Sequence, residues 1–195
     1  MVKTKTIKVF LLIIAGFYLF NCAGTNYKKM STENPRLLLA IEDSLMFENK
    51  NDQNIIDALT NANNNIGKSY LIEGELSLAI NHFKKAISLN SDNKLSNYSL
   101  LIAEGRALVK KGNKNGMWDA IEKFSKASNL FPKKGEPFYW MAISYTKLGD
   151  TEFDLILESY EKSLSLELSE VIKIEVQKKY KKAKTRKSKL DSFWK

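Results

Sequence analysis

Three places in this sequence carry side chains whose types could do chemistry. Cys22 is the only cysteine, His82 is the only histidine, and Lys68 and Ser69 follow a glycine. A thiol can act as a nucleophile or a point of attachment, and an imidazole can act as an acid, a base or a metal ligand. A lysine followed by a serine can hold a phosphate and its magnesium ion. Whether any of this chemistry is possible depends on the elements that position these side chains.

The segment 62–69, ANNNIGKS, contains the lysine, the serine and one of the glycines of a phosphate-binding loop. Such a loop must follow a buried strand, and its glycines let backbone N–H groups turn toward the phosphate. The sequence just before it, NIIDALTN, repeats its apolar residues at helical spacing instead. We therefore predict that Lys68 and Ser69 lie on a helix and bind no nucleotide.

The remaining catalytic signals are weak. His82 has no cysteine partner, because Cys22 is committed elsewhere, and no second histidine with which to build a metal site. The serine hydrolase signature G-x-S-x-G is absent from the sequence. We predict a protein that is not an enzyme and uses no cofactor or metal, with His82 as an ordinary interface or surface residue.

Cys22 directly follows a short apolar segment. Residues 9–20, VFLLIIAGFYLF, carry no charge, and Lys3, Lys5 and Lys8 precede them. A helix that spans a membrane needs about 20 apolar residues, so this segment is too short. A basic start followed by a short apolar run is typical of a signal peptide.

The order Leu19-Phe20-Asn21-Cys22-Ala23 resembles the lipobox of bacterial lipoproteins. In that family the peptide is cut just before the cysteine, and the thiol receives a diacylglycerol. The resemblance implies a signal peptide at 1–21, a lipid on Cys22 and a polar tether at 22–35. It also implies a place on the exported side of a bacterial membrane, either periplasmic or at the cell surface. The alternative is a buried, inert Cys22 inside a signal anchor.

Positive charge is concentrated at the C-terminal end. The whole chain has a formal charge of +9, and residues 171–195 hold ten Lys and Arg against two acids. Three interpretations are open for this tail: a solvated capping helix, a contact with anionic lipid headgroups, or a contact with nucleic acid. An exported protein meets little nucleic acid, so the third is the weakest.

From Arg36 onward, apolar residues recur at helical spacing and only Pro132 and Pro137 interrupt the pattern. No useful stretch alternates with a period of two, which predicts an all-α fold. A motif of small and aromatic residues also recurs. Its three copies are Ala79-x3-Phe83-x2-Ala86, Ala120-x3-Phe124-x2-Ala127 and Ile156-x3-Tyr160-x2-Ser163, the first preceded by Gly67-x2-Tyr70.

This recurrence resembles the tetratricopeptide repeat, a helix-turn-helix unit of 34 residues. The resemblance covers residues 60–168 and implies an α-solenoid of about three repeats. Extra residues of the second copy, KKGNKNG at 110–116, are expected in a loop. An N-terminal helical segment at 36–59 and a basic capping helix at 169–195 complete the predicted chain.

In the repeat family, the first helix of each pair lines an inner groove that takes a peptide or a partner helix. The resemblance implies the following groove residues here: Asn61, Asn64, Lys68, Ser99, Arg106, Lys110, Tyr139, Ile143 and Thr146. Lys68, Arg106 and Lys110 suit an acidic segment or a terminal carboxylate. The alternative is that all nine are simply the exposed sides of three helices.

Together these features predict a membrane-anchored scaffold for protein–protein interaction in the bacterial cell envelope, including envelope or outer-membrane assembly. The expected partners are a protein or peptide and, through Cys22, the membrane. No nucleic acid and no small-molecule substrate are expected. The alternative function is a signal-anchored protein whose basic C-terminal helix binds anionic membrane or nucleic acid.

Overall fold

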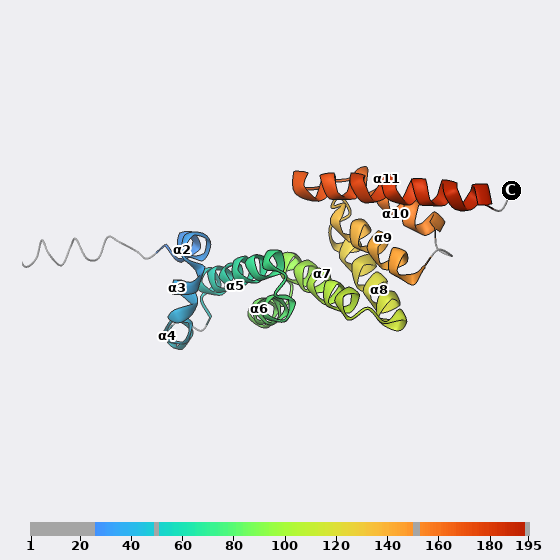
Figure 1. The fold of residues 1–195 in the computed structure, drawn as a ribbon. Coiled ribbons are helices and arrows are strands. Elements are labelled where there is room, and N and C mark those ends of the chain that lie inside the picture. The colour runs from blue at the N-terminus through green and yellow to red at the C-terminus, as the bar shows by residue number, and fades with distance from the viewer. Residues whose placement is uncertain (1–25, 49–50, 150–152, 194–195) are drawn as a thin grey trace, which may run out of the picture.

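The computed structural model describes residues 26–48, 51–149 and 153–193, and this part of the chain is helical with short connections (Figure 1). Three short helices gather at one end: α2 (Tyr27–Glu33), α3 (Pro35–Ala40) and α4 (Glu42–Glu48). Three hairpins follow, α5 (Gln53–Glu73) with α6 (Leu76–Leu89), α7 (Lys94–Lys111) with α8 (Lys114–Leu130), and α9 (Glu136–Leu148) with α10 (Phe153–Leu164). The helix α11 (Glu170–Phe193) lies across the other end. The predicted all-α solenoid of helical hairpins is confirmed.

Each hairpin turns at a glycine. Gly74, Gly112 and Gly149 follow α5, α7 and α9 with φ angles of 82°, 80° and 120°. These are backbone conformations that a side chain makes costly, so glycine ends the first helix of every pair. The turn after α7 is only Gly112 and Asn113 long, and α8 begins at Lys114. The prediction of a loop at 110–116 is therefore wrong, because most of these residues extend the two helices.

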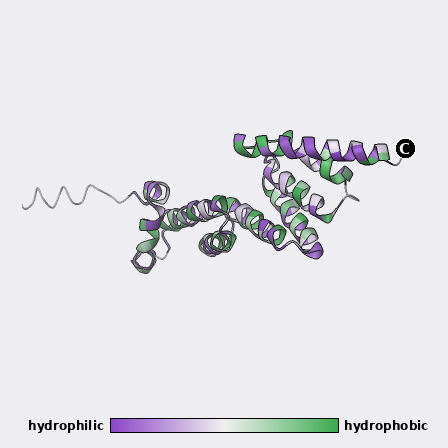
Figure 2. Cartoon of the chain, in the orientation of Figure 1, coloured by the Kyte–Doolittle hydropathy of each residue, from purple (hydrophilic) through white to green (hydrophobic). Residues whose placement is uncertain are grey.

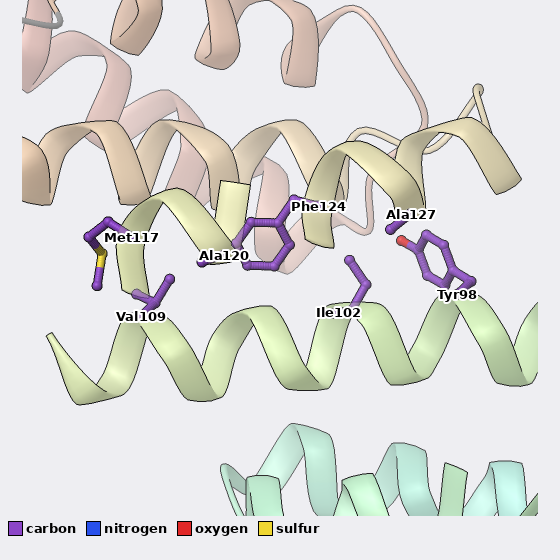
Figure 3. Packing of buried hydrophobic residues seen from close by; sticks show 7 residues of the cluster. All are labelled: Tyr98, Ile102, Val109, Met117, Ala120, Phe124 and Ala127. Atoms are coloured by element: carbon purple, nitrogen blue, oxygen red, sulfur yellow. The ribbon is translucent and has the colours of Figure 1, made fainter. Parts of the chain in front are cut away.

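Inside the first two hairpins, an aromatic ring of the second helix lies against a glycine of the first. A Cβ atom on Gly67 would stand 2.6 Å from the Phe83 ring, and one on Gly105 would stand 2.5 Å from the Phe124 ring. Both phenylalanines are fully buried. Figure 3 shows the second hairpin, where Tyr98, Ile102 and Val109 of α7 face four residues of α8, namely Met117, Ala120, Phe124 and Ala127.

Packing continues from hairpin to hairpin, since α6 contacts α7 and α8 contacts α9. Hydrophilic and hydrophobic residues alternate along the helices (Figure 2), and the buried apolar residues gather in clusters within and between the hairpins. At the first end, α2 and α3 pack on α5. The Asn65 side-chain amide donates to the Ser31 carbonyl at 2.9 Å and fixes α2 in place. Residues 27–33, expected to belong to a tether, are therefore a packed helix.

At the other end, α11 covers the third hairpin with four residues spaced for one helix face: Ile172, Val176, Tyr180 and Ala183. Val176 is completely buried. The Tyr180 hydroxyl donates to Glu161, and Lys187 pairs with Asp154. These contacts attach the basic helix to α10 along its length.

Two connections of the chain are joined by an isolated parallel bridge between Lys134 and Glu167. The Gly135 N–H donates to the Glu167 carbonyl, and the Glu167 N–H donates to the Lys133 carbonyl, both at 2.9 Å. The Ser163 hydroxyl also donates to the Gly135 carbonyl at 2.9 Å. The connection between the second and third hairpins is thereby tied to the one that leads into α11.

Cys22 and the predicted signal peptide at 1–21 lie outside the described residues. Among the helices that the structure describes, none combines the length and the apolar character required to cross a membrane.

Candidate functional site

The segment 62–69 lies in the middle of α5. Its backbone N–H groups are therefore used inside the helix and cannot turn toward a phosphate. Gly67 is needed for close contact with Phe83, and the Ser69 hydroxyl donates to the Asn65 carbonyl at 3.2 Å. Lys68 and Ser69 are simply exposed positions of a helix.

His82 holds α5 and α6 together. Its Nδ1 lies 3.0 Å from the Asn63 Oδ1, and its ring stacks on Tyr70 with centroids 5.7 Å apart. The Asn63 side-chain amide donates to the Leu59 carbonyl. The side-chain oxygen of Asn63 can only accept, so it accepts from the His82 Nδ1–H. Burial, and then the nearby positive charge of Arg36, lower the pKa of His82. In the part of the chain that the structure describes, no three His, Cys, Asp or Glu side chains gather as a metal site.

The nine predicted groove residues lie on α5, α7 and α9 but in different surroundings. Asn61, Lys68, Lys110 and Thr146 are exposed, and Ser99, Arg106 and Ile143 are half-buried. Asn64 and Tyr139 are only 5% and 3% exposed. The accessible residues of the predicted groove are therefore mostly on α5 and α7, whereas Asn64 of α5 and Tyr139 of α9 are buried.

The C-terminal helix α11 covers part of α9. Tyr139 belongs to the core that α9 and α10 form with Val176 of α11, and its hydroxyl is hydrogen-bonded to Glu175. Burial, and then that carboxylate, raise the pKa of Tyr139. Ile143 and Thr146 line a small cavity under α11. Tyr139 and, on α5, Asn64 are therefore corrected from open groove positions to buried residues, while Ile143 stays half-buried and Thr146 stays exposed at the edge of this cavity.

Arg106 is the most constrained cation of the remaining surface. Its guanidinium carbon lies 4.8 Å from the centre of the Trp140 ring, and that ring stacks on Phe124 with centroids 6.3 Å apart. Burial lowers the pKa of Arg106, and the negative charge of Glu136 partly offsets this effect. Within the described residues its guanidinium forms no ion pair. A charged fork of N–H donors is thus held in place without a carboxylate partner.

Glu136, the acid whose charge acts on the pKa of Arg106, is hydrogen-bonded to another residue. The Tyr98 hydroxyl donates to the Glu136 Oε2 at 3.1 Å, and burial followed by this carboxylate raises the pKa of Tyr98. The Lys134 ammonium lies 4.8 Å from the centre of the Tyr98 ring. The Glu136 carboxylate is therefore hydrogen-bonded to Tyr98 and forms no ion pair with Arg106 among the described residues.

A polar cavity of about 830 Å³ lies beside the first hairpin, between the start of α2, α5 and the turn from α6 to α7. Asn61 of the predicted groove lines it. Asp57 and Asp92 lie in its wall together with Lys28 and Lys94, so its charges are mixed. The accessible surface on α5 and α7 thus has a polar hollow at one end and Arg106 at the other.

Sequence reasoning selected Arg106 but missed Trp140, whose ring lies against the guanidinium, and Glu136, whose charge acts on its pKa. Both lie on α9, one repeat further along the chain. The available signal was weak: Trp140 lies 34 residues after Arg106, which is one repeat length, so the two occupy corresponding places in neighbouring first helices.

No protein-family model matches this chain, and no curated protein matches it. Among solved structures, the chain is similar to MamA, from residue 41 to its end, of Desulfovibrio magneticus RS-1. The two share 14% sequence identity, with 80% of this chain and 86% of that chain covered and a TM-score of 0.48.

Proposed function

We propose that this protein is a lipid-anchored scaffold of the bacterial envelope that binds a partner protein along α5 and α7. The observation that carries the proposal is Arg106, a half-buried guanidinium fixed on Trp140 with no ion pair within the described residues. The stack of hairpins supplies a long surface for such a partner, and His82, which could act as an acid or base, is engaged in packing.

The chemistry favours an acidic partner. A guanidinium presents N–H donors in a planar fork that matches a carboxylate, and such charge-assisted hydrogen bonds are the stronger ones. Because Trp140 already holds the side chain, little conformational entropy remains to be lost on binding. Lys110 lies one helical turn after Arg106 on the same face of α7 and is exposed, so it extends the positive surface.

The partner surface can be tested at Arg106. Crosslinking in intact cells with mass spectrometry would identify the partner, and calorimetry would measure its affinity. Arg106→Gln should weaken binding by about tenfold or more, because a hydrogen bond to a charged group is worth about 1.5–3 kcal/mol. Lys111→Gln is the matched control, since Lys111 lies on the same helix but turned away from Arg106. Equal affinities for both variants, with unchanged thermal unfolding, would reject the surface.

The anchor can be tested at Cys22. The support for it is the basic start and short apolar segment before this cysteine. Cys22→Ser should abolish incorporation of a labelled fatty acid and release the protein into the soluble fraction, because two or more acyl chains are needed for stable anchoring. Ala23→Ser places the same residue one position later and should leave both the label and the anchoring intact. A Cys22→Ser protein that still carries the label would contradict the anchor.

The second candidate is a signal-anchored protein whose basic helix binds anionic membrane or nucleic acid. The observation in its favour is α11, where Lys178, Lys181, Lys182 and Lys189 are exposed together with Val171 and Ile174. This candidate differs from the first in its response to salt. If it holds, Cys22→Ser stays on the membrane and added salt weakens the contact made by α11.

A further inference from the structure

A second cavity, of about 260 Å³, lies between α9, α10 and α11. It stands at the opposite end of the stack from α2, α3 and α4 (Figure 1). Residues of all three helices form its walls, so it exists only because α11 packs on the third hairpin. The partner surface proposed above does not include it.

The inner wall of this cavity is apolar. Phe153, Ile156 and Tyr160 of α10 line it and are 9%, 2% and 2% exposed, and Ile143 and Ala183 add aliphatic surface from α9 and α11. The Tyr160 hydroxyl is hydrogen-bonded to Thr146, whose own hydroxyl donates to the Ala142 carbonyl at 2.7 Å. The polar atoms of this wall are therefore occupied, and the space is suited to a hydrocarbon group.

The rim is positively charged. Lys147 comes from α9, and Lys179, Lys182 and Arg186 come from successive turns of α11. Lys179 pairs with Glu175 at 3.5 Å, and Arg186 lies over the Phe153 ring at 5.9 Å. The described lining includes no carboxylate, and in the described part of the chain Lys147 and Lys182 form no ion pair. An apolar space is thus surrounded by cations, two of which have no acidic partner there.

We propose that this cavity binds an anionic amphiphile, a hydrocarbon chain that ends in a carboxylate or a phosphate. The chain enters the apolar wall between α9 and α10, and the head group meets Lys147 and Lys182 at the rim. A free fatty acid and the acidic end of a membrane lipid share this chemistry, so the experiment must distinguish these two sources.

The test uses the full-length chain, so that any affinity of the apolar segment 9–20 is common to all variants. Calorimetry with sodium dodecanoate and with dodecyl maltoside, both below their micelle concentrations, separates the charge from the tail. Dodecanoate should bind. The maltoside should bind at least about tenfold more weakly, because its uncharged head group cannot pair with the lysines of the rim. Equal affinities for the two compounds would overturn the proposal.

Two variants test whether dodecanoate binds in this cavity. Ala183→Leu fills the space from α11 and should weaken dodecanoate binding by about tenfold or more, since the apolar wall can no longer be covered by the ligand. Lys147→Gln combined with Lys182→Gln changes only surface side chains and should weaken it by about three- to tenfold. Lys181→Gln is the control, because Lys181 is exposed on the side of α11 that faces away from the cavity. If Ala183→Leu fails to fold, the double lysine variant decides.

Unchanged dodecanoate binding in the double lysine variant would overturn the proposal. Vesicles that contain phosphatidylglycerol distinguish the sources of the ligand. Competition between these vesicles and dodecanoate supports a membrane lipid as the source, and dodecanoate binding without such competition supports a free fatty acid. Vesicle binding without any dodecanoate binding would overturn the cavity and assign the cations of α11 to a lipid surface. These outcomes leave the Arg106 surface untouched, so the two proposals fail separately.

Discussion

Replacing Phe124 with alanine should lower the free energy of unfolding by about 3–5 kcal/mol. The ring is completely buried and lies between α7 and α8 (Figure 3). It leaves no room for a side chain at Gly105 and stacks on Trp140. Its loss removes apolar contact within the second hairpin and support for the third. Since small domains are stable by only about 5–15 kcal/mol, urea unfolding followed by circular dichroism should show a much lower midpoint. A midpoint close to that of the parent protein would contradict this packing.

A substitution at Gly105 is the control for this prediction. Its effect on stability should change sign when Phe124 is replaced. Alone, Gly105→Ala places a Cβ atom 2.5 Å from the ring and should destabilise the protein by about 1–3 kcal/mol. In the Phe124→Ala background the space is open, and alanine is a better helix former than glycine by about 1 kcal/mol. The same substitution should then stabilise. If Gly105→Ala changed the stability equally in both backgrounds, the Phe124 ring would not be the reason for a glycine at this position.

Replacing Gly135 with alanine should cost about 2–3 kcal/mol of stability. A Cβ atom there would stand 2.4 Å from the Ser163 carbonyl oxygen, and a backbone atom cannot move aside as a side chain can. The backbone conformation of Gly135 does not itself disfavour alanine, because φ is −80° and ψ is −17°, values that any residue can adopt. The new methyl group must instead separate the connection before α9 from the end of α10, and with it the hydrogen bonds to Glu167.

Gly116→Ala is the matched control for Gly135. Its Cβ would meet the Asn113 Oδ1 at 2.8 Å, but that atom belongs to a side chain, which can shift slightly and still accept from the N–H of residue 116. The cost should stay below about 1 kcal/mol, because alanine also favours the helix. Thermal and urea unfolding of the two variants should therefore differ clearly. Similar losses for both would show that the bridge between the two connections adds little stability.

Sequence periodicity predicted the fold well because it records which side of each helix is buried. Phe83, Phe124 and Tyr160 recur at corresponding places and are all buried in their hairpins. The ends of the elements were less predictable. Gly112 and Gly116 look alike in the sequence, yet only Gly112 adopts a positive φ angle, while Gly116 lies in the first turn of α8 and donates its N–H to Asn113. That difference arises from the capping side chain and not from glycine content.

The candidate site was predicted in part, since its position depends on contacts between repeats. Helical spacing places Asn61, Lys68 and Arg106 on accessible sides of α5 and α7. It cannot show that α11 returns over Tyr139, or that Trp140 comes to lie beneath Arg106. Both arrangements join residues that lie more than 30 positions apart, where only the packing of complete hairpins determines what meets. The contact between Gly105 and Phe124, which lies within one hairpin, was also missed.

The helix α9 contributes to two places at once. Trp140 supports Arg106 on one side, and Ile143, one turn later, forms a wall of the cavity under α11. A shift of this helix that suits an occupant at one place must also move the other. Thermodynamic linkage then requires any such influence to be mutual: a ligand in the cavity that strengthens the hold on a partner would itself be held more tightly when the partner is bound.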